Sequence, residues 1–177
     1  MKKFCAILLV SCVFSGQSFA NGGIGGGIEF VSPVGDFEEI AGGGYGFFGD
    51  IYVPLNHNML LNFHAGFLAY GGLKWPDGSE IAWGGIPLTI GGVFYPSGVE
   101  EGGLYLKGSG GVLFKVGVAT DSYGREETVD RTNSVISAGV GISGGPLDFS
   151  ADYNISPADG DGVDFEWIGI KVGILLR

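Results

Sequence analysis

Apolar residues alternate with small or polar residues along most of the chain after residue 20. In the segment 103–118, for example, Leu104 and Phe114 fall on one parity, whereas Tyr105 and Lys107 fall on the other. A two-residue period is that of a β-strand, whose successive side chains point to opposite faces of a sheet. No helical period persists for three turns, so the pattern predicts an all-β chain of eight strands near Gly23–Val31, Gly44–Leu55, Met59–Gly71, Ile81–Tyr95, Gly103–Val118, Ser134–Ser143, Leu147–Ile155 and Asp164–Leu176.

The composition of the two strand faces indicates which face meets water. A soluble sheet also alternates, but its water-facing side normally carries many Lys, Glu, Thr and Arg residues. Here the less apolar face is mostly Gly, Ser, Tyr and Asn. Small side chains of this kind suit the crowded interior of a narrow eight-stranded barrel. The apolar face is then expected to contact lipid, and Val116→Arg is expected to destabilise the barrel by about 2–4 kcal/mol if Val116 meets the bilayer midplane.

The connections between the predicted strands alternate in length. The segments that follow the odd-numbered strands are long: Ser32–Gly43, Gly72–Glu80, Ala119–Asn133 and Ser156–Val163. The segments that follow the even-numbered strands are short or intermediate: Asn56–Asn58, Pro96–Gly102 and Gly144–Pro146. Long outer loops and tight periplasmic turns are typical of outer-membrane barrels. A closed barrel also pairs the backbone N–H and C=O groups of every strand edge, which is required because the hydrocarbon core of the bilayer contains no water. The expected fold is an eight-stranded antiparallel up-and-down transmembrane β-barrel with girdle aromatics at Tyr45, Trp83, Phe94, Tyr95 and Trp167.

The first 20 residues read as a cleaved signal peptide. Lys2 and Lys3 precede an apolar run, and the segment ends in Ser18-Phe19-Ala20, a small-x-small cleavage site. We therefore expect a signal peptide at 1–20 and a barrel domain at 21–177, exported through the periplasm to the outer membrane. Lipidation of Cys12 after an earlier cut is the alternative.

The cysteine content and net charge of the mature chain limit the ligands and partners that it can bind. Both cysteines lie in the leader, so the mature chain would lack disulfides and thiolate ligands. Without Lys2 and Lys3 it would carry 7 basic against 19 acidic residues, a net charge of −12. This charge argues against nucleic acid or an anionic lipid surface as a partner, and we expect no nucleic acid to bind. Most of the acidic residues fall in the predicted loops, including the stretch 121–130, which is expected to form an exposed acidic loop.

The mature chain resembles the small outer-membrane β-barrel superfamily, which includes the OmpA transmembrane domain, OmpX and porin-like proteins. The segments that carry the resemblance are 86–95, 104–112, 148–153 and 168–174. The resemblance implies a non-enzymatic protein of the Gram-negative cell envelope. It also implies contacts with outer-membrane lipid and the barrel-assembly machinery, and surface or peptidoglycan-associated partners.

Charged residues inside the predicted strands are the candidate site. All seven fall on the face opposite the apolar one: Glu29, Asp50, Lys107, Lys115, Asp148, Asp152 and Lys171. Buried charges are tolerated when they are paired, so a lumenal ion-pair network that plugs the barrel is one interpretation. A gated polar pathway for ions or small solutes is the other.

Residues for other chemistry are sparse. His57 and His64 lack the nearby serine of the His-x-Ser arrangement in lipid-A deacylase barrels. Two G-x-G-x-x-G matches, at 44–49 and 139–144, are not expected to open helices. In the acidic segment 158–164, Val163 stands where a calcium loop needs a ligand. We therefore expect no enzyme activity, no catalytic or metal-binding residue and no cofactor.

Three functions follow from this reading. The first is a structural or surface-interaction barrel with acidic extracellular loops and a plugged polar lumen. The second is a narrow porin-like channel for ions or small solutes. The third is a soluble periplasmic lipid-binding barrel, which would require the apolar face to point inward around a ligand.

Overall fold

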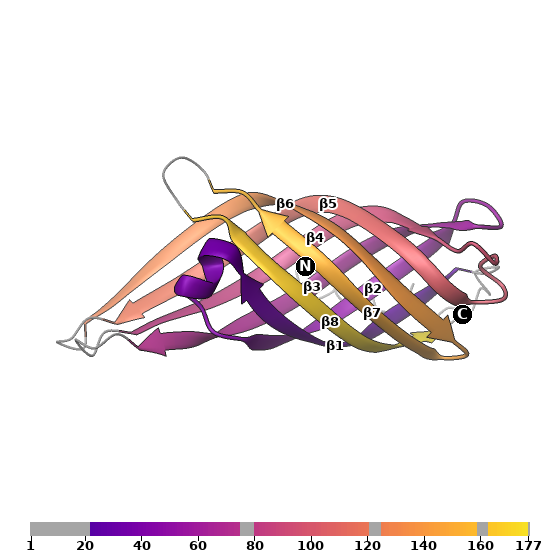
Figure 1. Cartoon of the computed structure of the whole chain (residues 1–177). Helices are drawn as coiled ribbons and strands as arrows, with labels where there is room; N and C mark the ends of the chain where they lie inside the picture. The colour runs from indigo at the N-terminus through magenta and orange to yellow at the C-terminus, as the bar shows by residue number, and fades with distance from the viewer. Residues whose placement is uncertain (1–21, 75–79, 121–124, 159–162, 177) are drawn as a thin grey trace, which may run out of the picture.

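Eight antiparallel strands close into one barrel in the computed structural model, which describes residues 22–74, 80–120, 125–158 and 163–176 (Figure 1). Each strand pairs with its neighbours in sequence, and β8 pairs with β1 to complete the ring. The predicted fold class is therefore confirmed, whereas the proposed leader lies outside the described residues. The strands are β1 (Gly23–Val34), β2 (Gly44–Pro54), β3 (Met59–Lys74), β4 (Glu80–Phe94), β5 (Gly103–Thr120), β6 (Glu126–Gly144), β7 (Leu147–Ser156) and β8 (Phe165–Leu176).

One predicted loop is wrong. Most of Ala119–Asn133 is strand, because β5 continues to Thr120 and β6 already begins at Glu126. Residues 126–133 pair with residues 113–120 of β5. Apart from Val129, residues 126–133 are all polar or charged in the sequence, so there was no apolar alternation to read. Exposed Asp130 therefore lies on a strand and not in the predicted acidic loop, of which residues 121–124 lie outside the described residues.

The apolar faces of the strands point outward, as predicted. Leu104, Phe47 and Ile136 are 69%, 61% and 59% exposed in the isolated barrel, while the alternate positions face the interior. A water-facing sheet would lose solvation free energy with such a surface, whereas hydrocarbon matches it. The arrangement contradicts the soluble lipid-binding barrel, because that function requires these side chains to line an internal pocket.

The predicted aromatic girdle is only partly correct. Tyr45 and Phe94 do project outward, with 62% and 42% of their surface exposed. Tyr95 and Trp167 are each 1% exposed, and partly buried Trp83 packs against the interior cluster of apolar side chains. Trp83 on β4 and Trp167 on β8 have inward parity, and Tyr95 is the first residue after β4. These three rings fill the lumen and do not lie at the membrane interface.

Val116 faces outward as expected but is not near the midplane. It lies 13 residues beyond Gly103, the first residue of β5, and pairs with the exposed Asp130 of β6. With a rise of about 3.3 Å per residue and a tilt of about 40°, this places it about 33 Å from the periplasmic end of its strand. An outer-membrane barrel has an apolar band about 25 Å tall, so Val116 lies beyond the outer edge of that band.

A short 3-10 helix, η1 (Gly35–Glu39), follows β1 at the outer end of the barrel (Figure 1). Gly35 has a φ of 61°, a left-handed conformation that glycine adopts without strain, and this turn directs the chain back over the barrel mouth. The one apolar side chain of η1, Phe37, is fully buried, whereas Asp36 and Glu38 are exposed. No helix among the described residues has the length and apolar character needed to cross a membrane.

Candidate functional site

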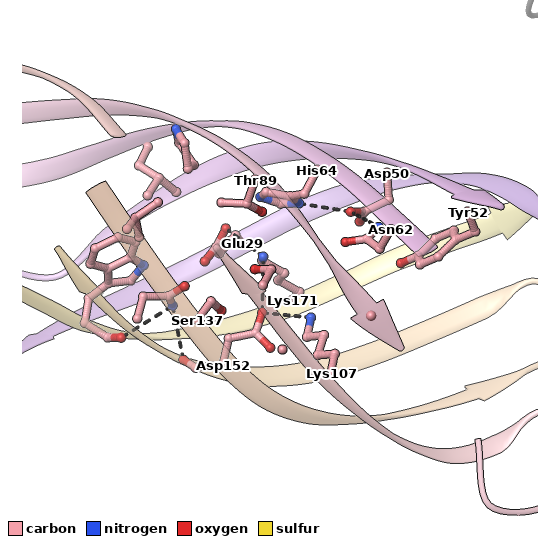
Figure 2. Close-up of a pocket in the computed structure, with 18 residues that line it drawn as sticks. Glu29, Asp50, Tyr52, Asn62, His64, Thr89, Lys107, Ser137, Asp152 and Lys171 are labelled. Carbon is pink, nitrogen blue, oxygen red and sulfur yellow. Dashed lines mark hydrogen bonds and ion pairs between the residues drawn. The ribbon is translucent and has the colours of Figure 1, made fainter. Parts of the chain in front are cut away.

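Charged side chains gather at mid-height in the barrel interior (Figure 2). Glu29, Asp50, Lys107, Asp152 and Lys171 come from five different strands and line one small cavity. Each occupies an inward-facing position, because the two-residue period of its strand places the flanking apolar residues outside. The structure thus brings together five of the seven charged residues singled out in the sequence.

Asp152 is the centre of this network. Its Oδ2 atom lies 2.8 Å from Nζ of Lys107 and 3.1 Å from Nζ of Lys171, and its side chain is 1% exposed. Lys171 also reaches Oε2 of Glu29 at 3.7 Å. Lys107 donates a further hydrogen bond to Oγ of Ser150 at 2.9 Å. Two acids and two lysines therefore form one continuous buried chain of ion pairs.

Asp50 extends the polar layer through two residues that the sequence analysis did not place there. Its Oδ1 atom lies 3.0 Å from Nδ1 of His64 and accepts a hydrogen bond of 2.9 Å from Nδ2 of Asn62. His64 and Asp50 are direct cross-strand partners in the β2–β3 register. Their shared inward parity was visible in the sequence, but their pairing depended on the register.

The other two predicted charges lie apart from the network. Asp148, nearer the periplasmic end, accepts a hydrogen bond from the hydroxyl of Tyr105 at 3.0 Å. Lys115, in the outer half of β5, holds Nζ 3.9 Å from the centroid of the Phe165 ring. Both side chains are buried inside the barrel. The single seven-residue network of the sequence interpretation is thus divided between three places.

An apolar layer covers the ionic layer on its outer side. Phe37 descends from η1 and stacks on Phe165 at 4.1 Å between ring centroids, with the Tyr70 ring edge-on at 5.0 Å. Rings at these separations are in direct packing contact. The buried residues of this outer layer are Val31, Phe37, Ala41, Leu68, Tyr70, Leu113, Val135, Phe165 and Trp167.

A second apolar layer covers the periplasmic side. Tyr95 and Val99, both in the connection between β4 and β5, are 1% and 2% exposed and pack against Tyr105. The Tyr95 hydroxyl also accepts a hydrogen bond of 3.3 Å from Oγ of Ser143. Connections at both ends therefore contribute side chains that close the barrel, and the polar layer lies between them.

The cavity in the polar layer has a volume of about 30 Å³. This is room for one or two water molecules, which can satisfy polar groups that lack a protein partner. No group of three or more potential metal ligands occurs among the described residues. His57 is exposed in the β2–β3 turn and far from the interior pairing of His64, so the two histidines do not form one site. The chamber can hold charges and water in place.

Both G-x-G-x-x-G segments are strands, as expected. Residues 44–49 belong to β2 and residues 139–144 to β6, so neither opens a helix with free N–H groups. The calcium-like segment 158–164 lies partly outside the described residues, at 159–162. Within the described part, Asp164 accepts a hydrogen bond from the backbone N–H of Ala158 at 2.7 Å, which closes the base of this connection.

Gly139 has a specific role in the ionic layer. In the strand register it lies directly between Lys107 of β5 and Asp152 of β7. A Cβ atom at this position would clash with Oδ1 of Asp152 and with the carbonyl oxygen of Ala151. The absence of a side chain therefore lets an ion pair bridge two strands that are not neighbours.

We expect Gly139→Ala to lower the free energy of unfolding by about 1–3 kcal/mol, the usual effect of overpacking a filled interior. Gly144→Ala is the matched control on the same strand, because a Cβ atom there meets nothing within 4 Å. Denaturant titration of both variants in detergent micelles measures the difference. Equal stabilities would show that the Lys107–Asp152 bridge tolerates an added methyl group.

The closed barrel with an apolar exterior and a polar interior has the fold of small outer-membrane β-barrel proteins. No protein-family model matches the chain, and no curated protein matches it. Among solved structures, the barrel is similar to Ail, the attachment invasion locus protein of Yersinia pestis, with a TM-score of 0.63 and 16% identity over 88% of this chain and 97% of that one.

Two further barrels show the same architecture. Neisserial surface protein A has a TM-score of 0.57 and 11% identity over 89% of this chain and 97% of its own. The N-terminal β-barrel domain of Pseudomonas aeruginosa OprF has a TM-score of 0.56 and 14% identity over 88% of this chain and 99% of its own. At these identities the comparisons establish the fold, and they confirm the resemblance to small outer-membrane barrels at that level.

Proposed function

We propose that this chain is a non-enzymatic protein of the outer membrane that closes its own lumen and uses its outer end for surface interactions. The observation that carries the proposal is the layering of the interior, in which a buried ionic layer lies between two apolar layers. A hydrated ion would have to displace both apolar layers to pass. The two apolar layers and the ionic layer between them therefore close the lumen together.

The location rests on the outward apolar surface and on the fold shared with outer-membrane proteins. Export would use the signal peptide at 1–20, and insertion would use the barrel-assembly machinery. Outer-membrane lipid would be the permanent partner of the apolar belt. A large exposed apolar surface of this kind is unfavourable in water and leads to association or aggregation.

The outer end offers a surface for interaction. In Figure 1 the β5–β6 hairpin extends well beyond η1. Among the described residues, β6 pairs with β7 only from Ile136 onward, so its outer part has one edge without a strand partner. Exposed polar side chains occupy that part, including Thr128, Asp130 and Arg131. Unpaired strand edges and exposed polar side chains are common recognition surfaces.

The charge of the chain limits the kind of partner. Ail has been solved in complex with the heparin analogue sucrose octasulfate, a polyanion. The present chain has a formal net charge of −10, and its described outer end exposes acids such as Asp36 and Glu38. Long-range repulsion disfavours a polyanion at such a surface. We therefore propose a neutral or basic surface partner for this barrel.

Conductance distinguishes the plug from the narrow channel. We expect the refolded protein in a planar lipid bilayer to show no unitary current steps, and we expect Lys107→Met to remain equally silent because both apolar layers are intact. Reproducible steps in the original protein, with an ion selectivity that Lys107→Met alters, would favour the channel instead. A heat-dependent change in gel mobility verifies that each sample is a folded barrel before the recording.

A further inference from the structure

The outer wall of the barrel has a hollow of about 320 Å³ on strands β1, β2 and β3, which lie side by side (Figure 1). Its outward-facing residues are all apolar or glycine, and the wall of the barrel forms its floor. The residues that line this β1–β3 hollow are Ile24, Gly25, Gly49, Asp50, Ile51, Phe63, His64 and Ala65.

The hollow arises from the register of small residues. Gly49 of β2 pairs with Gly26 of β1 on one side and with Ala65 of β3 on the other. Along its own strand, Gly49 is flanked on the same face by Phe47 and Ile51, which are 61% and 44% exposed. Bulky side chains therefore stand on both sides of a row of small residues. The row forms a depression between these side chains.

We propose that the β1–β3 hollow binds one acyl chain of a phospholipid from the periplasmic leaflet. The inference rests on the proposed membrane location and adds a defined lipid site to it. The hollow is continuous with the outward apolar belt, through Phe47 on β2 and Phe67 on β3, both more than half exposed. An acyl chain laid in it gains dispersion contacts with the flanking side chains that a flat wall does not provide.

The depth of the hollow selects the leaflet. Ile24 is the second residue of β1, at the periplasmic end of the barrel, and Gly49 is five residues from Pro54, the last residue of β2. With a rise of about 3.3 Å per residue and a tilt of about 40°, Gly49 lies about 12 Å from that end. The hollow thus extends from Ile24, near the periplasmic end, to about the middle of an apolar band about 25 Å tall, which is the depth of the periplasmic leaflet.

A second copy of the chain fits the hollow less well. A symmetric dimer through this face would place hollow against hollow, because a two-fold interface uses the same patch on both subunits. The small residues would then face one another across a void, which loses packing contacts. A flexible acyl chain adapts to the depression without that loss.

A photoreactive lipid tests the site. The protein is refolded in vesicles of phosphatidylethanolamine and phosphatidylglycerol that contain a trace of phosphatidylethanolamine with a diazirine on one acyl chain. After illumination, mass spectrometry of peptides locates the cross-links. The filling variant is Gly49→Leu, because a Cβ atom at Gly49 meets only the carbonyl oxygen of Gly25, at 3.9 Å. The control is Gly108→Leu, an exposed glycine on β5 whose Cβ would meet only the carbonyl oxygen of Ser137, at 3.9 Å.

We expect cross-links to concentrate at Ile51 and Phe63, to fall to the level of the opposite wall in Gly49→Leu, and to persist in Gly108→Leu. Even labelling of all outward faces, or labelling that Gly49→Leu leaves unchanged, would overturn the site while leaving the membrane location intact. A dimer in native mass spectra that Gly49→Leu dissociates would assign the hollow to a second copy. If no outward residue is labelled at all, the proposed membrane location itself fails.

Discussion

Replacement of Asp152 with alanine is expected to lower the free energy of unfolding by about 3–5 kcal/mol, the usual effect of removing one partner from a buried ion pair. The variant leaves Lys107 and Lys171 inside the barrel without the carboxylate that both of them contact, at 2.8 Å and 3.1 Å. Lys171 keeps only the longer contact with Glu29, at 3.7 Å. The interior then no longer compensates either ammonium group for the hydration free energy that it lost on burial.

Asp130→Ala is the matched control for this variant. Asp130 is an exposed acid on β6, where substitutions usually change the stability by less than about 0.5 kcal/mol. Guanidinium unfolding of both variants in detergent micelles, followed by tryptophan fluorescence, measures the difference. Similar midpoints for the two variants would mean that water enters the lumen freely and that the ion pairs do not plug it.

An arginine in place of Val140 is expected to destabilise the barrel in a bilayer by about 2–4 kcal/mol, the range for a cation on the lipid-facing side near the midplane. Val140 is 54% exposed on the outer face of β6 and four residues from Gly144, the end of the strand. This places it about 10 Å from the periplasmic end, close to the middle of the apolar band. No acid lies opposite it, since its pairing partners are Leu106 and Ala151.

The control for this prediction lies on the same strand and the same face. Thr128 is exposed and paired with Val118, twelve residues further toward the outer end than Val140. Thr128→Arg should change the stability by no more than about 1 kcal/mol, because the penalty for a cation falls toward the interface. Reversible unfolding in phospholipid vesicles gives both values. A Val140→Arg protein as stable as Thr128→Arg would refute a lipid-facing orientation of this surface.

Strand positions were the part of the fold that the sequence predicted best. The start of β5 at Gly103 and its alternating faces follow directly from side-chain parity, because a strand places successive residues on opposite sides. The outer part of β6 was missed for the same reason, since Thr128, Asp130 and Thr132 present no apolar period outside the membrane. The Trp167 ring was assigned to the interface from its residue type, although its parity already pointed inward.

The amino-acid sequence by itself determined that the chain forms an all-β barrel, which faces are apolar, and that its strand charges share the inward face. These properties depend on the order of residues within one strand. Only the tertiary structure decided that Asp152 joins Lys107 across Gly139, that His64 joins the layer through Asp50, and that Phe37 and Tyr95 close the ends. Contacts between separate strands depend on the stagger at which the barrel closes, and that stagger is set by all eight strands together.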